Sequence, residues 1–292
     1  MKIKWLGVAV VALLVLGMAA GCRPKAAQQA QTAQQAQSQA PISTAAPVDT
    51  LSGTLKIGGS TSVQALNTEL AGAFMKKHPG VKVQVVGGSL DSGITAVQKG
   101  TADIGAVPRV LTAQEMSAFK NYVIALEGVV IIVNPANGVS GLTMDQARQV
   151  FDGQITNWQA VGGGAAAIDL FTRERGSGTR SILQGIVMGQ DKISSTAGIQ
   201  NSTEAIRAAV AGDHGGIGYI SLGDLNSSVK ALSIQGVRPS RQTVFNASYK
   251  ISRPYFYITK DDPQGLTKAF IDFVLSPEGQ AVVAKMKFVT SK

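Results

Sequence analysis

TLKIGGSTSVQALNTELAGAFMKKHPGVKVQVVGGSLDSGITAVQKGTADIGA, residues 54–106, has the clearest regular pattern in the sequence. Short apolar segments alternate in it with amphipathic ones: we expect strands at 54–58, 81–86 and 102–106, and helices at 62–78 and 93–100. Such βαβαβ order predicts a mainly parallel sheet, whose ligands bind at the carboxyl ends of the strands. Functional residues are therefore expected in the loops that lead from strands into helices.

The same alternation continues to the end of the chain. Residues 128–134 contain five consecutive apolar residues, which predicts a fully buried strand that crosses between two lobes. We expect further strands at 167–172 and 216–220, and helices at 143–151, 179–188, 203–211, 263–275 and 277–286. At 292 residues, 45% of them hydrophobic, the chain is long enough for one or two domains with hydrophobic cores.

The N-terminal segment has the pattern of a secretory signal. A basic start, Met1–Lys4, precedes an apolar run, Trp5–Ala20, which ends at Gly21 and at Cys22, the only cysteine of the sequence. Ala19-Ala20-Gly21-Cys22 resembles the lipobox of bacterial lipoproteins, although that family favours Leu at the position of Ala19. We expect a lipoprotein signal peptide at 1–21 and lipidation of Cys22; an ordinary secreted protein or an uncleaved anchor are the alternatives.

A low-complexity segment rich in Ala and Gln follows, and we expect residues 22–52 to form a flexible tether. Without residues 1–50 the net charge falls from +9 to +6, from 23 basic and 17 acidic residues. A modest positive field suits a protein that collects anions. The basic residues are scattered and no helix carries a basic stripe interleaved with aromatics, so we expect no nucleic-acid binding.

Two loops contain the groups that an oxyanion needs. In residues 58–62, GGSTS, backbone N–H groups and the hydroxyls of Thr61 and Ser62 precede a predicted helix. In residues 173–180, RERGSGTR, an arginine fork accompanies Ser177 and Thr179. Each loop taken alone has a plainer explanation, a helix cap or a solvated turn. Two such loops in the two halves of one chain favour an anion site.

The motifs GGSTSVQAL, GGSLDSGITAVQKGTADIGA, EGVVIIVNPANGV, VFDGQITNW, TRERGSGTR and GGIGYIS resemble those of the phosphate-binding proteins of bacterial ABC phosphate importers. They occur in the order of that family and cover nearly everything from Gly53 to the end. The resemblance implies an α/β, type II periplasmic-binding-protein fold: two α/β lobes with a ligand cleft and a crossover-strand hinge. It places residues 53–130 and 245–292 in lobe 1 and residues 131–244 in lobe 2.

By position, the resemblance implies a set of phosphate-binding residues: Thr61, Ser62, Ser89, Arg173, Ser177, Gly178 and Thr179. Ser89 is one of two possible alignments of the GGSLDSG motif. The sequence departs from the family after residue 105, where relatives carry a ligand aspartate or Ser-Ser-Arg and this chain has Ala106-Val107-Pro108-Arg109. One usual polar contact is therefore missing.

Glu127 stands where related sequences often have an aspartate, so it is a candidate acceptor for the proton that phosphate carries at neutral pH. A buried carboxylate would accept this proton but repel sulfate, which has none. Asp91 is the second candidate. The alternative for Glu127 is a structural carboxylate that caps a turn or pairs with Arg109.

These observations predict an extracytoplasmic, lipid-anchored protein that captures inorganic phosphate and delivers it to the membrane subunits of an ABC importer. We expect a monomer that is not an enzyme and needs no cofactor or metal. His78 and His214 are poorly placed for catalysis, and nucleophile-elbow, Walker A and metal-ligand motifs are absent from the sequence. The alternatives are a binding protein for another tetrahedral oxyanion, suggested by Pro108, and a phosphate-sensing or adhesion lipoprotein.

Overall fold

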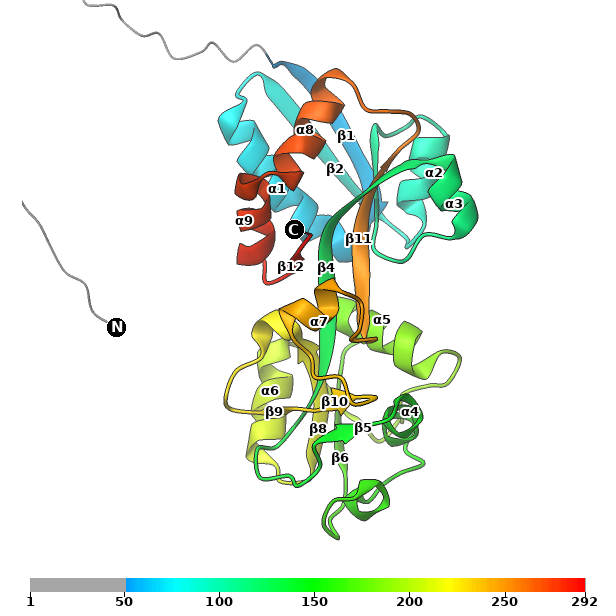
Figure 1. Ribbon diagram of the computed structural model, residues 1–292, viewed down its shortest axis with the longest axis vertical. Coiled ribbons are helices and arrows are strands. Elements are labelled where there is room, and N and C mark those ends of the chain that lie inside the picture. The colour runs from blue at the N-terminus through cyan, green and yellow to red at the C-terminus, as the bar shows by residue number, and fades with distance from the viewer. Residues whose placement is uncertain (1–50, 292) are drawn as a thin grey trace, which may run out of the picture. The chain divides into compact units, whose positions relative to one another are not determined.

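Two strands, β4 (Lys120–Val133) and β11 (Ser252–Thr259), run through the middle of the main sheet and connect two α/β lobes (Figure 1). The structure is a computed structural model that describes residues 51–291. Its strand order is β2-β1-β3-β11-β4-β8-β6-β7. β4 pairs with β11 as far as Gly128 and with β8 from Val129 onward, so this one strand belongs to the sheets of both lobes.

Lobe 1 is built on the parallel strands β1 (Gly53–Ser60), β2 (Val81–Gly88) and β3 (Ile104–Val107), as the apolar segments predict. Its helices are α1 (Gln64–Lys77), α2 (Ser92–Gln98), α3 (Ala113–Ala118), α8 (Gly265–Leu275) and α9 (Pro277–Lys285). Leu66, Leu70 and Phe74 of α1 are buried at helical spacing against Phe270 and Phe273 of α8. This periodic apolar face holds the helical layer on the sheet.

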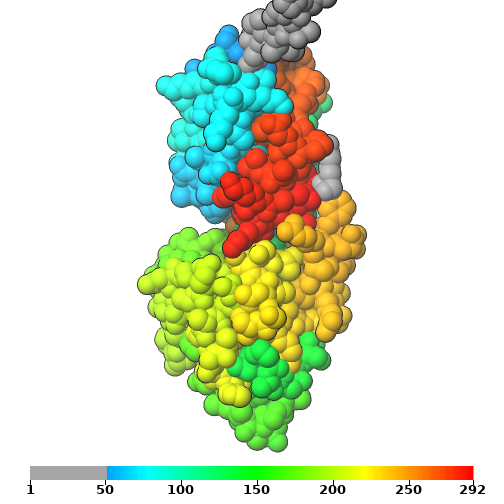
Figure 2. All heavy atoms as spheres, turned by 90° about the vertical axis from the view of Figure 1, so that its left-hand side faces the viewer, coloured from blue at the N-terminus to red at the C-terminus, as the bar shows by residue number. Residues whose placement is uncertain are grey.

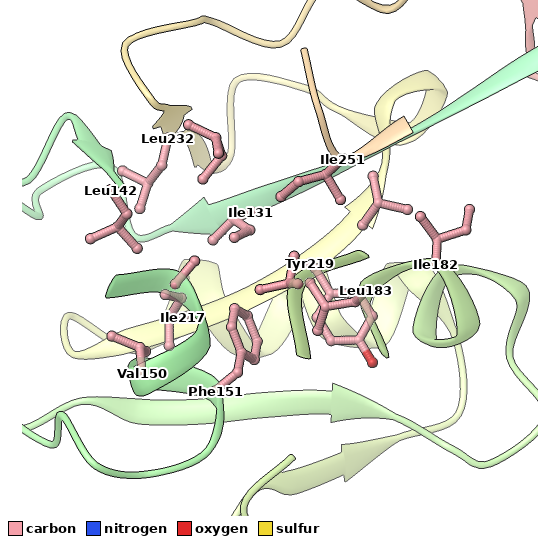
Figure 3. Close-up of a cluster of buried hydrophobic side chains, with 14 of the residues drawn as sticks. Ile131, Leu142, Val150, Phe151, Ile182, Leu183, Ile217, Tyr219, Leu232 and Ile251 are labelled. Carbon is pink, nitrogen blue, oxygen red and sulfur yellow. The ribbon is translucent and has the colours of Figure 1, made fainter. Parts of the chain in front are cut away.

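Lobe 2 contains the parallel strands β8 (Gly216–Ser221), β6 (Asp169–Arg173) and β7 (Gly198–Gln200). Its helices are α4 (Met144–Phe151), α5 (Gly178–Leu183), α6 (Thr203–Gly212) and α7 (Arg241–Phe245). Short strands complete it: β5 (Gly141–Leu142), β9 (Lys230–Ala231) and β10 (Ser233–Ile234). Figure 3 shows its core, where Phe151 and Tyr219 pack edge to face with ring centroids 5.7 Å apart.

Glycine allows α2 to lie unusually close to the sheet. A Cβ added to Gly105 on β3 would lie 2.5 Å from the carbonyl oxygen of Gly93 on α2, closer than real Cβ contacts come. A Cβ on Gly93 would in turn lie 2.8 Å from the carbonyl oxygen of Ala106. The backbone of α2 therefore packs directly on β3, which fixes the loop between β2 and α2.

The structure corrects the sequence expectations in the middle of the sheet. β4 begins at Lys120, eight residues before the predicted crossing strand, and β11 was not predicted. Pro254 lies within β11 and has no N–H to donate, so the segment does not resemble an interior strand. β11 is antiparallel to both of its neighbours, β3 and β4, so the sheet is parallel in its outer parts and antiparallel where the lobes join.

The predicted signal peptide (1–21), Cys22 and all of the tether (22–52) except Leu51 and Ser52 lie outside the described residues. Within residues 51–291, no helix is long and apolar enough to cross a membrane.

An ion-pair cluster holds α3, a short helix that buries none of its own residues. Arg109 donates to Asp91 Oδ1 at 2.7 Å and to both carboxylate oxygens of Glu115 at 2.8 Å. Glu115 also accepts from the backbone N–H of Thr112, whose hydroxyl caps the helix in return. The hydrogen bond from Arg109 and the N–H of Thr112 lower the pKa of Glu115 to about 2.

We predict that Glu115→Gln lowers the free energy of unfolding by about 1–2 kcal/mol at pH 7, because the charged pairs are partly exposed. A carboxyl group whose pKa is lowered by folding stabilises the protein above its unfolded pKa and loses this effect as the pH falls through the folded one. The difference between variant and wild type should therefore shrink between about pH 4.5 and pH 2. Urea unfolding at several pH values measures this difference, and Glu69→Gln, which changes an exposed carboxylate, is the control. If Glu115→Gln and the wild type had the same free energy of unfolding at pH 7, the ion-pair cluster would not stabilise the fold.

Candidate functional site

The end of β6, the loop that follows it and the start of α5 carry four of the residues expected to bind phosphate: Arg173, Ser177, Gly178 and Thr179. β6 ends at Arg173, and Ser177 caps α5 by accepting the N–H of Arg180 at 3.3 Å. Ser177 and Thr179 are both more than 90% buried, with their hydroxyl oxygens 3.0 Å apart. The strand, loop and helix order is the one that the sequence predicts, and it presents hydroxyl groups and the backbone of Gly178 on one side of the loop.

Arg173 is held from two directions. Its backbone N–H donates to the hydroxyl of Tyr219 at 3.1 Å, and this ring belongs to the lobe 2 core (Figure 3). Its guanidinium forms a bidentate pair with Glu174 at 2.8 and 2.9 Å and donates to Thr203 Oγ1 at 3.1 Å. The hydrogen bond from Arg173 lowers the pKa of Glu174. Within residues 51–291, three of the five guanidinium N–H groups are engaged in these bonds, and the other two are available to an anion.

A polar cavity of about 250 Å³ lies beside this loop. Its walls come from β4, the β6–α5 loop, the start of α6, the end of β8 and the segment after α9. The lining residues are Glu127, Arg173, Ser177, Gly178, Thr179, Thr203, Ser221, Asp224, Met286, Lys287 and Phe288. Five of the eight residues that the sequence proposed as phosphate contacts are therefore brought together in one cavity.

Glu127 is 8% exposed at the cavity wall and is fixed by two partners. The Tyr255 hydroxyl donates to its Oε2 atom, and Arg253 Nη2 lies 3.4 Å from the same oxygen. Burial, followed by the nearby Glu127 carboxylate, raises the pKa of Tyr255 well above its usual value, so this hydroxyl keeps its proton and remains a donor. Arg109, the partner that the sequence suggested for Glu127, pairs with Asp91 and Glu115 instead.

The remaining expected contacts lie together in lobe 1, outside the lining of this cavity. Ser60 and Gly88 are neighbours in the β1–β2 register, and Thr61 donates from its hydroxyl to Gly88 O at 3.1 Å. Ser60 accepts the N–H of Ser62 at 3.3 Å, so it caps the 3-10 turn before α1. Ser89 lies within 3.0 Å of Ser92, hydroxyl to hydroxyl. Thr61, Ser62 and Ser89 are exposed, so these three hydroxyl groups form a polar cluster on the surface of lobe 1.

The cavity also contains residues that the sequence did not indicate. Lys287 reaches Asp224 across the two lobes and pairs with it through Nζ and Oδ1, and this hydrogen bond raises the pKa of Lys287. Figure 2 shows the face on which the red C-terminal segment meets the yellow part of lobe 2. Thr203, Asp224 and Lys287 belong to no motif that was identified, and only the fold brings them to the site. In the described part of the chain, no cluster of His, Cys, Asp or Glu could hold a metal ion.

Comparisons with known proteins agree with this architecture. A family model described as the PBP superfamily domain matches residues 44–278. The phosphate-binding protein PstS of Bacillus subtilis is 32% identical over 234 residues, which cover 78% of this chain and 77% of that protein.

Solved structures give the same result. An ABC-type phosphate transport receptor from Vibrio cholerae is 32% identical, with a TM-score of 0.75 over 82% of this chain and 100% of the receptor. A substrate-binding protein from Clostridium perfringens, solved with bound phosphate, is 36% identical, with a TM-score of 0.60 and the same coverage. These likenesses confirm the predicted α/β, type II periplasmic-binding-protein fold, and these relatives are binding proteins rather than enzymes. The chain belongs to the PBP superfamily and, within it, to the PstS family of phosphate-binding proteins.

Proposed function

We propose that this protein captures inorganic phosphate outside the cytoplasm and delivers it to the membrane subunits of an ABC importer. The observation that carries the proposal is the cavity in which Arg173 and the Ser177–Thr179 loop lie together. Two free guanidinium N–H groups, two hydroxyls and the backbone of Gly178 match the oxygens of a tetrahedral anion. The relatives named for phosphate binding and phosphate transport support the same ligand.

The hinge accounts for how the second set of contacts would reach the ligand. Thr61, Ser62 and Ser89 lie on lobe 1, whereas Arg173 lies on lobe 2, and the two lobes share the strands β4 and β11. Bending at these strands brings the hydroxyls of lobe 1 onto a phosphate that is already held by lobe 2. We assign residues 53–130 and 245–292 to lobe 1 and residues 131–244 to lobe 2 for this motion.

Glu127 would select phosphate over sulfate. Its Oε2 atom is occupied by Tyr255 and Arg253, whereas no hydrogen bond to its Oε1 atom is recorded within residues 51–291. A carboxylate oxygen in the cavity wall accepts the proton of hydrogen phosphate and repels an anion that has none. Asp91, the second candidate, is engaged by Arg109 and does not line the cavity.

The membrane attachment rests on the N-terminal sequence. We propose that cleavage after Gly21 exposes Cys22, that lipid chains on this residue anchor the protein, and that residues 22–52 form the tether. We also propose that the protein acts as a monomer.

A second candidate ligand is another tetrahedral oxyanion. The observation that favours it is Pro108, a buried residue directly after β3 that offers no polar side chain where relatives provide one. Titration with sulfate, molybdate and phosphate under the same conditions separates the two candidates.

We predict that the chain without residues 1–22 binds phosphate in calorimetric titration at pH 7, and that Arg173→Ala weakens this binding at least about 100-fold. The variant loses charge-assisted hydrogen bonds and a positive charge at the cavity wall. Arg148→Met is the control for the loss of one positive charge, because it removes a half-exposed arginine on α4 that pairs with Asp145 and Asp191. An unchanged affinity in a folded Arg173→Ala protein would rule out this site.

We predict that Glu127→Gln narrows the ratio of phosphate affinity to sulfate affinity by about 10-fold or more, because an amide neither requires the ligand proton nor repels sulfate. Competition titrations of both anions on variant and wild type measure the ratio. Glu69→Gln serves as the remote control, since it changes an exposed carboxylate on α1 that does not line the cavity. A ratio equal to that of the wild type would remove Glu127 from the recognition of phosphate.

A further inference from the structure

Arg253 is a buried arginine directly behind the cavity wall. It lies on β11 opposite Glu127 of β4 in the strand register and is 8% exposed. A Cβ atom added to Gly178 would lie 3.9 Å from Arg253 Nη2. The Arg253 guanidinium therefore lies directly behind Gly178, which lines the cavity, whereas Arg253 itself does not line it.

The contacts of Arg253 connect three parts of the site. Its Nη2 atom lies 3.4 Å from Glu127 Oε2 and donates to the Tyr255 hydroxyl at 3.0 Å. Tyr255 in turn donates to the same Glu127 oxygen and packs against Phe288, with ring centroids 5.3 Å apart. Through Nη1, Arg253 donates to Ser181 Oγ on α5 at 3.3 Å. Arg253 thus contacts both Glu127 on β4 and α5, the helix that begins directly after Ser177.

The energetics of this cluster favour a role in binding over a role in stability. A buried ion pair seldom adds net stability, because desolvation of both charges offsets their attraction. The Arg253 Nε–H is also buried and has no hydrogen-bond partner among the described residues, which is a further cost to folding.

We infer that Arg253 is a positioning residue for phosphate selectivity: it holds the Glu127 carboxylate in place through Oε2, leaves the second oxygen for the ligand and ties Glu127 to α5 through Ser181. The inference rests on the proposed function and deepens it, because it assigns the selection of a protonated oxyanion to a pair rather than to one carboxylate. Arg253 also adds a positive charge behind the loop, which strengthens the binding of any anion there.

The test compares Arg253→Met, which has a long side chain but no charge, with Arg253→Lys, Glu127→Gln and the double variant Glu127→Gln/Arg253→Met. Phosphate and sulfate dissociation constants are measured for each on the chain without residues 1–22. We expect Arg253→Met to weaken phosphate binding about 10- to 100-fold and to narrow the phosphate-to-sulfate ratio about as far as Glu127→Gln does. In the double variant the ratio should fall little further, because both changes remove the same interaction. Arg253→Lys should recover part of the ratio.

Thermal unfolding without ligand separates binding from folding, and Arg148→Met again serves as the control for loss of one positive charge. If Arg253→Met does not fold, Tyr255→Phe and Ser181→Ala interrupt the same network at single hydroxyl groups; a narrowed ratio in Tyr255→Phe would support the inference. If Arg253→Met folds and keeps the wild-type ratio of phosphate to sulfate affinity, the inference is wrong. If Arg253→Met does not fold, the wild-type ratio in Tyr255→Phe would overturn the inference instead. Absence of phosphate binding in the wild type would instead overturn the proposed function, and the inference with it.

Discussion

The antiparallel pairing of β4 with β11 is the constraint on which the rest of the structure depends. It joins the two lobes through a pair of strands, and it sets Glu127 opposite Arg253 at the point where β4 exchanges β11 for β8. A shift of β4 by one residue in this register would turn Glu127 to the other face of the sheet, away from Arg253. The strand pair that we propose as the hinge therefore also holds Glu127, the carboxylate that we propose selects phosphate.

The charged residues at the cavity form pairs with residues of opposite charge. Arg173 is shared between Glu174 and the cavity, Glu127 between Arg253 and the cavity, and Lys287 between Asp224 and the cavity rim. Each charged group that lines the cavity thus has a protein partner of opposite sign, which limits the cost of burying it. A dianion that enters this environment meets arranged donors without a large net positive charge. The proposed selectivity for phosphate over sulfate therefore depends on hydrogen-bond geometry more than on the net charge of the cavity.

Much of this organisation was predictable from the sequence. The periodicity of residues 54–106 indicated β1, α1, β2, α2 and β3, because strand ends and helix starts have local signals. The polar loop at residues 173–180 indicated an anion site there, and the family resemblance assigned Arg173, Ser177, Gly178 and Thr179 to it. β11 was missed because Pro254 interrupts the pattern of an interior strand, and α3 because it is short and held by Arg109 rather than by an apolar face. Arg253 and Lys287 have no local signal, since only the crossing of distant segments brings them to the site.

We propose that the hydroxyls of lobe 1 and Arg173 of lobe 2 close on one phosphate. Such closure must shorten the distance between a residue of lobe 1 and a residue of lobe 2. Cysteines introduced at the exposed positions Ser117 and Lys192 would carry spin labels in the chain without residues 1–22, and pulsed electron resonance would measure their separation. Phosphate should shorten this distance by more than about 2 Å, whereas sulfate at the same concentration should leave it unchanged. Phosphate binding with no change in the distance would contradict closure of the two lobes on the ligand.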